Sequence, residues 1–127
     1  MIRPPYLFRA RDKSLELGCK TRLMGVVNIT PDSFSDGGKH LETDSAVEYC
    51  LSLVEAGAEI LDLGAESSRP GALPVSVQEE VDRLLPVLEE LRDLVSIMIS
   101  VDTYKSPVAE AALNCGADIV NDIYAFR

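Results

Sequence analysis

The stretch LMGVVNITPDSFSDGGKH, residues 23–40, changes from apolar to polar within a few positions. Its first part, LMGVVNI (23–29), is an apolar run of strand length, which indicates a strand buried on both faces. From Asn28 to His40 the stretch carries two carboxylates, a phenylalanine, a glycine pair and the only histidine of the chain. A buried strand that leads directly into so polar a loop predicts functional groups at the C-terminal end of the strand.

The rest of the chain repeats this alternation of apolar runs and amphipathic stretches. Further strands are predicted at 59–64, 97–101 and 118–122, and helices at 44–57, at 76–94 and from Ser106 to just before Gly116. Strands and helices that alternate at a spacing of roughly 30 residues are typical of parallel βαβ units. The predicted fold class is therefore α/β.

The helix boundaries follow from capping residues. For the first helix, Thr43 or Asp44 is the expected N-cap and Gly57 the expected C-terminal stop. Ser76, three residues before Glu79, forms a capping-box pattern at the start of the second helix.

Prolines give further predictions for the second and third helices. Pro86 lies inside the helical pattern and predicts a kink or a break. In the third helix, Ser106 is the expected N-cap, Pro107 the first helical residue and Gly116 the residue beyond the end.

Residues 1–22 do not follow the alternation, and the segments LFRA (7–10) and SLELG (14–18) indicate a small hairpin before the first parallel strand. The nonapeptides EAGAEILDL (55–63) and NCGADIVND (114–122) share Gly, Ala, an acid and Ile in register. This similarity indicates either an internal repeat or the Gly-Ala preference of helix-to-strand turns, and both interpretations stay open.

The composition excludes several classes of protein. The formal charge of −9 disfavours binding to nucleic acid or to an anionic membrane surface, because both require a basic field. No apolar run approaches the roughly 20 residues of a membrane span, and no signal peptide is visible. The widely spaced Cys19, Cys50 and Cys115 indicate free thiols in a reducing compartment, so a cytoplasmic protein is expected.

Common catalytic and metal motifs are absent from the sequence. It contains neither the G-x-x-x-x-G-K-[ST] frame of a phosphate-binding loop nor the G-x-G-x-x-G frame of a dinucleotide site. One histidine, His40, cannot form a zinc cluster and is interpreted as a solvated loop residue. The charged run EEVDRLLPVLEELRD (79–93) is interpreted as a solvated helix face.

Polar residues gather instead where the predicted strands end. Because parallel strands present their C-terminal ends at one edge of a sheet, these residues are expected to share one rim. They are Asn28, Thr30, Asp32 and Asp36 after the first strand, Glu66, Ser67, Ser68 and Arg69 after the second, Asp102 and Thr103 after the third, and Asn121 and Asp122 after the fourth.

Asp102 and Asn121 each end a strongly apolar strand, where an ionised carboxylate is costly without donors. Asp102 either caps the following helix or, with Asn121, faces a cavity for a flat ligand that has N–H donors and carbonyl acceptors. Asp62, within the second strand, is expected to hold the interior together by hydrogen bonds. Arg69, in ESSRPGA (66–72), either clasps a carboxylate or phosphate or lies in a solvated turn.

These segments carry a resemblance to a known family. LMGVVNITPDSFSDGG (23–38) and DLGAESSRPGA (62–72) closely resemble the two signature segments of the dihydropteroate synthases, and ISVDT (99–103) with GADIVNDI (116–123) is similar to the third and fourth strand ends of that family. The resemblance implies a (β/α)8 TIM-type barrel, of which the first four βα units are present. It divides the chain into a hairpin segment at 1–22 and the N-terminal half of a pterin-binding barrel at 23–127.

The resemblance also implies an activity. Dihydropteroate synthases of folate biosynthesis condense 4-aminobenzoate with (7,8-dihydropterin-6-yl)methyl diphosphate and release pyrophosphate. In the segment after the first strand, Asn28 is expected to bind the Mg²⁺ that neutralises the pyrophosphate, and Asp36 to act catalytically by stabilising the pterin cation. Phe34 is expected to wall the aminobenzoate pocket, in which sulfonamide-like analogues would compete.

Further roles are implied for the later strand ends. Ser68, Arg69 and Pro70 are expected to contribute to the pyrophosphate and aminobenzoate sites, with Arg69 as the second catalytic residue. Asp102 and Asn121 are expected to hydrogen-bond the pterin ring.

The chain departs from the family in two ways. The family usually has Gly-Gly-Glu-Ser-Thr where residues 64–68 read Gly-Ala-Glu-Ser-Ser, which keeps a hydroxyl at Ser68. Family barrels need about 250 residues, so the later pterin-binding aspartate, lysine and arginine–histidine pair are missing from these 127 residues. The chain alone is therefore expected to be inactive, and the complete protein is expected to be a homodimer.

Two alternatives stay open. One is a pterin-binding methyltetrahydrofolate methyltransferase, against which the motifs TPDSFSDGG (30–38) and SSRPGA (67–72) argue. The other is a non-catalytic half-barrel that binds a pterin or assembles with a partner.

Overall fold

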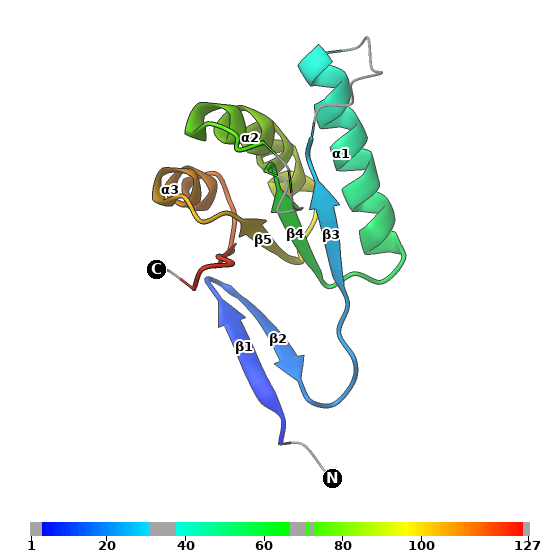
Figure 1. Ribbon diagram of the computed structural model, residues 1–127. Coiled ribbons are helices and arrows are strands. Elements are labelled where there is room, and N and C mark those ends of the chain that lie inside the picture. Colours follow the sequence, from blue (N-terminus) through cyan, green and yellow to red (C-terminus); the bar gives the residue numbers. More distant parts are fainter. Residues whose placement is uncertain (1–3, 31–37, 67–70, 72, 126–127) are drawn as a thin grey trace.

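The computed structural model describes residues 4–30, 38–66, 71 and 73–125 (Figure 1). Its elements, in chain order, are β1 Tyr6–Ala10, β2 Lys13–Leu17, β3 Met24–Asn28, α1 Gly38–Glu55, β4 Ile60–Gly64, α2 Val77–Leu94, β5 Met98–Asp102, α3 Ser106–Asn114 and β6 Ile119–Asn121. β1 and β2 form the expected antiparallel hairpin. The other strands form a parallel sheet in the order β3-β4-β5-β6, which confirms the predicted α/β class.

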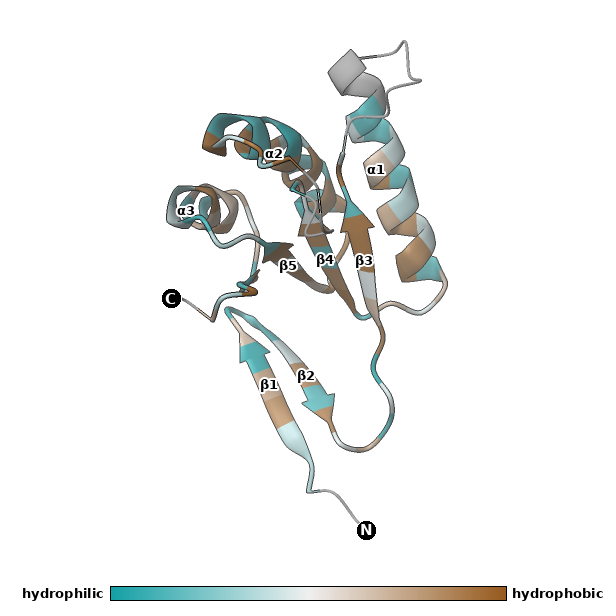
Figure 2. Ribbon diagram, in the orientation of Figure 1, coloured by the Kyte–Doolittle hydropathy of each residue, from teal (hydrophilic) through white to brown (hydrophobic). Residues whose placement is uncertain are grey.

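The core lies between the parallel sheet and its helices. Side chains at alternate strand positions are buried together with apolar side chains of α1, α2 and α3; on the strands they are Val27, Leu61, Leu63, Ile99 and Val101. Figure 2 shows this apolar character along β3, β4 and β5. Burial of this layer removes a large apolar surface from water and so provides the main stabilisation of the sheet.

The other face of the sheet is unevenly covered. On β3, Met24 and Val26 remain 49% and 57% exposed, whereas Met98 and Ser100 on β5 are buried. Apolar side chains that stay this exposed along a strand are a surface to which another chain segment can add.

The start of α1 differs from the prediction. The helix begins at Gly38, so Thr43 and Asp44 lie inside it and neither is the N-cap. Three of the four residues before them (39–42) are good helix formers, and Thr and Asp are tolerated within a helix at a small cost. These propensities extend the helix beyond the capping residues.

In α2, the predicted N-terminus is confirmed and the predicted break is not. Ser76 is the N-cap, and its side chain accepts a hydrogen bond from Glu79 N over 3.1 Å. The helix continues through Pro86 as one element. Proline removes one backbone hydrogen bond, but the buried Leu84 and Val87 on either side hold the helix against the core.

The start of α3 is one residue earlier than predicted. Lys105 is the N-cap, so Ser106 is the first helical residue and Pro107 the second. Gly57 and Gly116 follow the ends of α1 and α3 with φ of 115°, a conformation that favours glycine, and both expected stops are confirmed. Among the described residues, no helix is both long and apolar enough to cross a membrane.

The hairpin docks at the edge of the sheet where the strands begin. Lys13 Nζ donates to the Ile97 carbonyl and to Asp118 Oδ2, each over 2.8 Å. The Asp118 side chain is 3% exposed and also accepts a hydrogen bond from Ile99 N over 2.9 Å. This buried carboxylate thus ties the hairpin to both β5 and β6.

Other basic side chains of the hairpin segment support this docking. Six of the 12 Lys and Arg residues lie in the first 22 positions, so this segment is basic against an acidic remainder. Arg22 Nη1 lies 2.7 Å from Glu59 Oε2, whereas the exposed Lys20 reaches Glu59 only over 3.8 Å. Arg11 Nη2 donates to the Leu113 carbonyl at the end of α3 over 2.6 Å.

We expect Lys13→Met to lower the free energy of unfolding, measured by urea denaturation, by about 1–3 kcal/mol, because it leaves the buried Asp118 carboxylate without its cation. Lys20→Met is the matched control, since an exposed ion pair contributes at most about 0.5 kcal/mol. Equal losses for the two variants would show that the hairpin is not held by Asp118.

Candidate active site at the rim of the sheet

One row of residues crosses the sheet where its strands end. The backbone register pairs Asn28 with Gly64, Gly64 with Asp102, and Asp102 with Asn121. Each is the last residue of its strand, so three of the predicted site residues lie side by side at one rim. Ligands of parallel α/β proteins bind at this edge of the sheet.

Gly64 leaves a space in the middle of the row. A Cβ added there would lie 3.6 Å from Asp102 Oδ2 and 3.9 Å from Asn28 Oδ1. Two oxygen acceptors thus approach the same space from the neighbouring strands. Such a pair can accept hydrogen bonds from a ligand, and either oxygen is suited to a hard cation.

Among the described residues, Asp102 has no partner that neutralises its carboxylate. No described residue donates a hydrogen bond to its carboxylate; burial raises its pKa, and the charges of Asp62, Glu80 and Asp122 raise it further. The N-cap of α3 is Lys105, without a side-chain cap hydrogen bond, so Asp102 does not cap that helix. A ligand that brings N–H donors or positive charge would stabilise this carboxylate.

A hollow of about 180 Å³ opens beside Asp102. Within the part of the chain that the structure describes, its other walls come from the segments after β4 and β5, from α2 and from the residues after β6; they are Glu66, Glu80, Thr103, Tyr104, Ile123 and Tyr124. The rings of Tyr104 and Tyr124 meet edge to face, with centroids 5.2 Å apart. The hollow adjoins the row at Asp102. It does not include Asn28 or Asn121, whose side chains are exposed.

Below the row, Asp62 contacts Asn121 directly. Asn121 Nδ2 donates to Asp62 Oδ2 over 3.3 Å, across the 59 residues that separate the two positions in the sequence. Asp62 is 5% exposed. The contact agrees with the interpretation that Asp62 forms hydrogen bonds in the interior.

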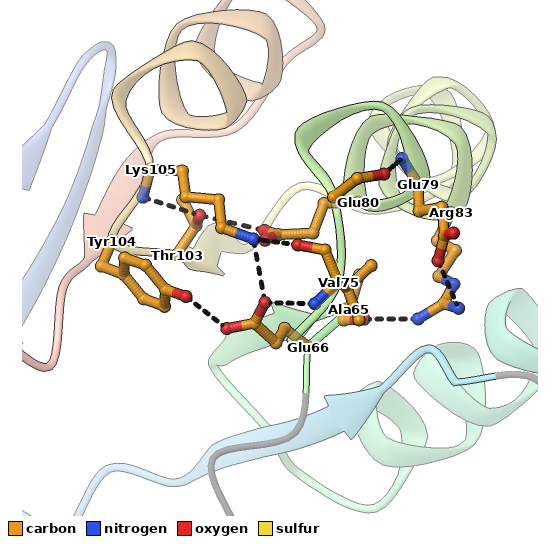
Figure 3. Close-up of polar contacts among 10 residues, drawn as sticks. Ala65, Glu66, Val75, Glu79, Glu80, Arg83, Thr103, Tyr104 and Lys105 are labelled. Atoms are coloured by element: carbon orange, nitrogen blue, oxygen red, sulfur yellow. Dashed lines mark hydrogen bonds and ion pairs between the residues drawn. The ribbon is translucent and has the colours of Figure 1, made fainter. Parts of the chain in front are cut away.

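Lys105 joins the segments that follow β4 and β5 (Figure 3). Its Nζ lies 2.8 Å from Glu66 Oε2 and 2.5 Å from Glu80 Oε1, and it donates to the Val75 carbonyl. Val75 N donates to Glu66 Oε2 over 2.8 Å. One ammonium group therefore holds together Glu66 and Val75, which lie on either side of the segment that carries the predicted Ser68 and Arg69.

Thr103 and Tyr104 complete this network. Thr103 Oγ1 donates to Glu80 Oε2 over 3.1 Å, and the Tyr104 hydroxyl donates to Glu66 Oε1 over 2.7 Å. Burial alone lowers the pKa of Lys105, but its ion pairs with Glu66 and Glu80 outweigh burial and raise that pKa to about 12. Burial also acts to raise the pKa of Glu66, yet hydrogen bonds from Lys105 and its neighbours bring it below the ordinary value.

No sequence motif predicts this network. The charged run at 79–93 is predicted to be a solvated helix face, but Glu80 is 1% exposed, so this prediction is wrong for that residue. Glu80, Leu84, Val87 and Leu91 recur at the helical period and are all buried. The spacing of Glu80 from these leucine and valine positions was the signal that it faces inward.

Five predicted site residues lie outside the described residues. They are Phe34, Asp36, Ser68, Arg69 and Pro70. Their roles therefore remain predictions from the sequence.

We expect Lys105→Met to lower the free energy of unfolding by about 3–5 kcal/mol at pH 7, since it removes the cation that pairs with both Glu66 and the buried Glu80. The lowered pKa of Glu66 and the raised pKa of Lys105 set the pH window. The loss should be full above the ordinary pKa of Glu66, 4.5, and below that of Lys105, 10.5. It should shrink in acid as Glu66 protonates and in alkali as Lys105 deprotonates near pH 12.

The matched control is the double variant Lys105→Met/Glu80→Gln, which removes the charge of Lys105 together with that of Glu80, the most buried carboxylate of the network. The double variant should be more stable than Lys105→Met alone, because a neutral pair costs less to bury than an unpaired charge. Thermal unfolding measures this difference. A double variant as unstable as the single one would show that the unpaired charge of Glu80 is not the cause.

Comparison with known proteins places this rim in a family. Residues 24–127 match the family model described as pterin binding enzyme. The dihydropteroate synthase of Clostridium beijerinckii is 44% identical over 115 residues, which are 91% of this chain and 43% of that protein.

Solved structures agree with this match. The dihydropteroate synthase of Xanthomonas albilineans with 4-aminobenzoic acid superimposes with a TM-score of 0.87 at 46% identity, over 95% of this chain and 45% of that one. The Burkholderia cenocepacia dihydropteroate synthase complexed with 7,8-dihydropteroate gives a TM-score of 0.82 at 38% identity, over 97% of this chain and 40% of that one.

The chain spans less than half the length of these relatives. Its parallel sheet and helices correspond to part of a dihydropteroate synthase barrel, preceded by the hairpin, so the predicted partial barrel is confirmed. Because the family model covers most of the chain, and the polar rim lies within the matched residues, the chain belongs to the family of pterin-binding enzymes.

Proposed function

We propose that residues 1–127 are the N-terminal half of a dihydropteroate synthase, with a hairpin segment at 1–22 and a half-barrel at 23–127. The supporting observation is the row Asn28–Gly64–Asp102–Asn121, which aligns polar groups at the strand ends of a chain of this family. The active form would be the complete barrel, in which residues 1–127 are joined to a C-terminal half of family length.

Asp102 and Asn121 are proposed to bind the pterin ring. The pterin edge carries adjacent N–H donors. These match the Asp102 carboxylate, which receives no hydrogen bond from a described residue, and the neighbouring amide oxygen of Asn121. The same ligand would reduce the repulsion that Asp102 experiences from Asp62, Glu80 and Asp122. Binding energy would thus come from relief of an unfavourable charge arrangement.

Asn28 is proposed as the protein ligand of Mg²⁺. Mg²⁺ commonly binds through one or two protein oxygens with phosphates and waters completing its shell, and the Asn28 oxygen faces the space over Gly64. The described residues contain no group of three His, Cys, Asp or Glu that could hold a metal by themselves. When bound, the ion would neutralise the departing pyrophosphate.

The remaining roles are proposed for residues that lie outside the part of the chain that the structure describes. Ser68 and Arg69 are proposed to bind the pyrophosphate, and Asp36 to stabilise the pterin cation left when the carbon–oxygen bond breaks. Phe34 and Pro70 are proposed to hold the aminobenzoate, whose amine then attacks the methylene carbon and loses a proton. The reaction needs a stabilised leaving group and an oriented amine, and no base of unusual pKa.

Two other functions make different experimental predictions. A methyltetrahydrofolate methyltransferase would need a corrinoid as methyl acceptor. A non-catalytic half-barrel would bind a pterin or a partner chain without turnover, and the exposed Met24 and Val26 are the surface it would use.

A turnover assay tests the proposed function. The complete barrel should form dihydropteroate from 4-aminobenzoate and (7,8-dihydropterin-6-yl)methyl diphosphate without a corrinoid. A polypeptide of residues 1–127 alone should form no dihydropteroate. Light scattering should show that it forms dimers or larger assemblies through the exposed side chains of β3, Met24 and Val26. A stable monomer with measurable synthase activity would contradict the proposal of an incomplete site.

In the complete barrel, we expect Asp102→Ala to weaken binding of 6-hydroxymethyl-7,8-dihydropterin about ten- to a hundredfold by calorimetry, the cost of a charge-assisted hydrogen bond. Wild-type binding should weaken as the pH falls through the raised pKa of Asp102, because the protonated carboxyl loses an acceptor. The same titration in Asp102→Ala should lack this acid limb.

Two further variants make this test specific. Glu110→Ala removes an exposed acid of α3 and should leave the affinity unchanged. Gly64→Ala adds a methyl that meets no atom closer than 3.5 Å, so it should fold normally yet weaken binding by occupying the space between Asn28 and Asp102. Unchanged affinity in Asp102→Ala would remove Asp102 from the site.

A further inference from the structure

We propose that Asp62 is a positioning residue that fixes the amide of Asn121 so that its carbonyl oxygen faces the ligand. The inference rests on the proposed function, in which Asn121 contacts the pterin. Asp62 lies one layer below the rim, so its proposed role is to set the orientation of the Asn121 amide and not to contact the ligand.

Asp62 lies directly below the row formed by Asn28, Gly64, Asp102 and Asn121. The register pairs Asp62 with Ser100 and Gly64 with Asp102, so Asp62 and Ser100 lie two residues before the rim on the same face of the sheet. Asn121 Nδ2 donates to Asp62 Oδ2 over 3.3 Å. An ionised carboxylate can only accept, so the amide NH₂ must turn toward Asp62 and the amide oxygen must turn away from it.

This orientation determines what the rim can recognise. Asp102 and Asn121 are register partners at the rim. With its oxygen turned outward, Asn121 adds a second acceptor beside the carboxylate of Asp102, and the pair matches a ligand edge with two adjacent N–H donors. With the amide reversed, the rim would offer a donor beside an acceptor and match a different edge.

A purely structural role does not account for Asp62. Its side chain is 5% exposed, yet Oδ1 has no hydrogen-bond partner among the described residues, and neither has the fully buried Ser100 Oγ next to it. The same layer carries apolar Val26 on β3 and Ile119 on β6. An apolar side chain would fill this layer without the cost of burying a carboxylate, so packing alone does not explain Asp62, whereas its contact with Asn121 does.

A double-mutant cycle on the complete barrel tests the proposal, with calorimetric binding of 6-hydroxymethyl-7,8-dihydropterin as the readout. Asp62→Asn keeps the shape of the side chain but accepts either orientation of the Asn121 amide, so affinity should fall about tenfold, the scale of one hydrogen bond to a charged group. In an Asn121→Ala background, Asp62→Asn should cause no further loss, because Asp62 acts through that amide.

Ser100→Ala is the matched control, since it removes the neighbouring buried polar group without touching Asn121. Its affinity should equal that of the wild type. Thermal unfolding of every variant separates loss of fold from loss of binding, and Asp62→Ser takes the place of Asp62→Asn in the cycle if the latter does not fold.

Each outcome has one consequence. Additive losses for Asp62→Asn and Asn121→Ala, an equal loss in Ser100→Ala, or an unchanged affinity in Asp62→Asn would overturn the positioning role while leaving the pterin site in place. An unchanged affinity in Asn121→Ala would instead contradict the proposed function itself, so the two failures are distinguishable.

Discussion

The backbone register between β3, β4, β5 and β6 is the constraint on which both the core and the rim depend. In a strand, neighbouring side chains point to opposite faces, so a slip of one residue would exchange the two faces. Val27, Leu63 and Val101 would then leave the helix layer, and Asn28 and Asp102 would enter it. Burial of the apolar positions therefore holds the polar positions in line at the rim.

The two edges of the sheet carry different tasks. At the edge where strands begin, Lys13 and Asp118 fasten the basic hairpin to the sheet. At the edge where strands end, Lys105 ties Glu66 to Glu80 and so links the segments that leave β4 and β5. Buried ion pairs such as these contribute little net stability, because desolvation offsets their attraction, but they lose much when one partner is removed. Their effect is to define geometry at the two ends of the strands.

The sequence was most informative where local chemistry acts alone. Ser76 and Glu79 predicted the start of α2, and Gly57 and Gly116 predicted where α1 and α3 stop, because capping depends on a few adjacent residues. Local signals failed where packing or propensity overrode them. Thr43 lies within α1, and Pro86 does not interrupt α2, since neighbouring residues favour or bury the helix more strongly than one residue opposes it.

By itself, the sequence determined the order of strands and helices, because hydrophobic periodicity predicts them. It also determined the polar rim and the family, because motifs such as those at 23–38 and 62–72 indicate both. Only the tertiary structure decided which distant groups meet. Asp62 and Asn121 are 59 residues apart and become partners through two strands that lie on either side of β5, and Lys105 finds Glu66 and Glu80 from separate elements. The physical reason is that a hydrogen bond or ion pair depends on distance in space, which the chain sets only after the apolar faces of its strands and helices have packed.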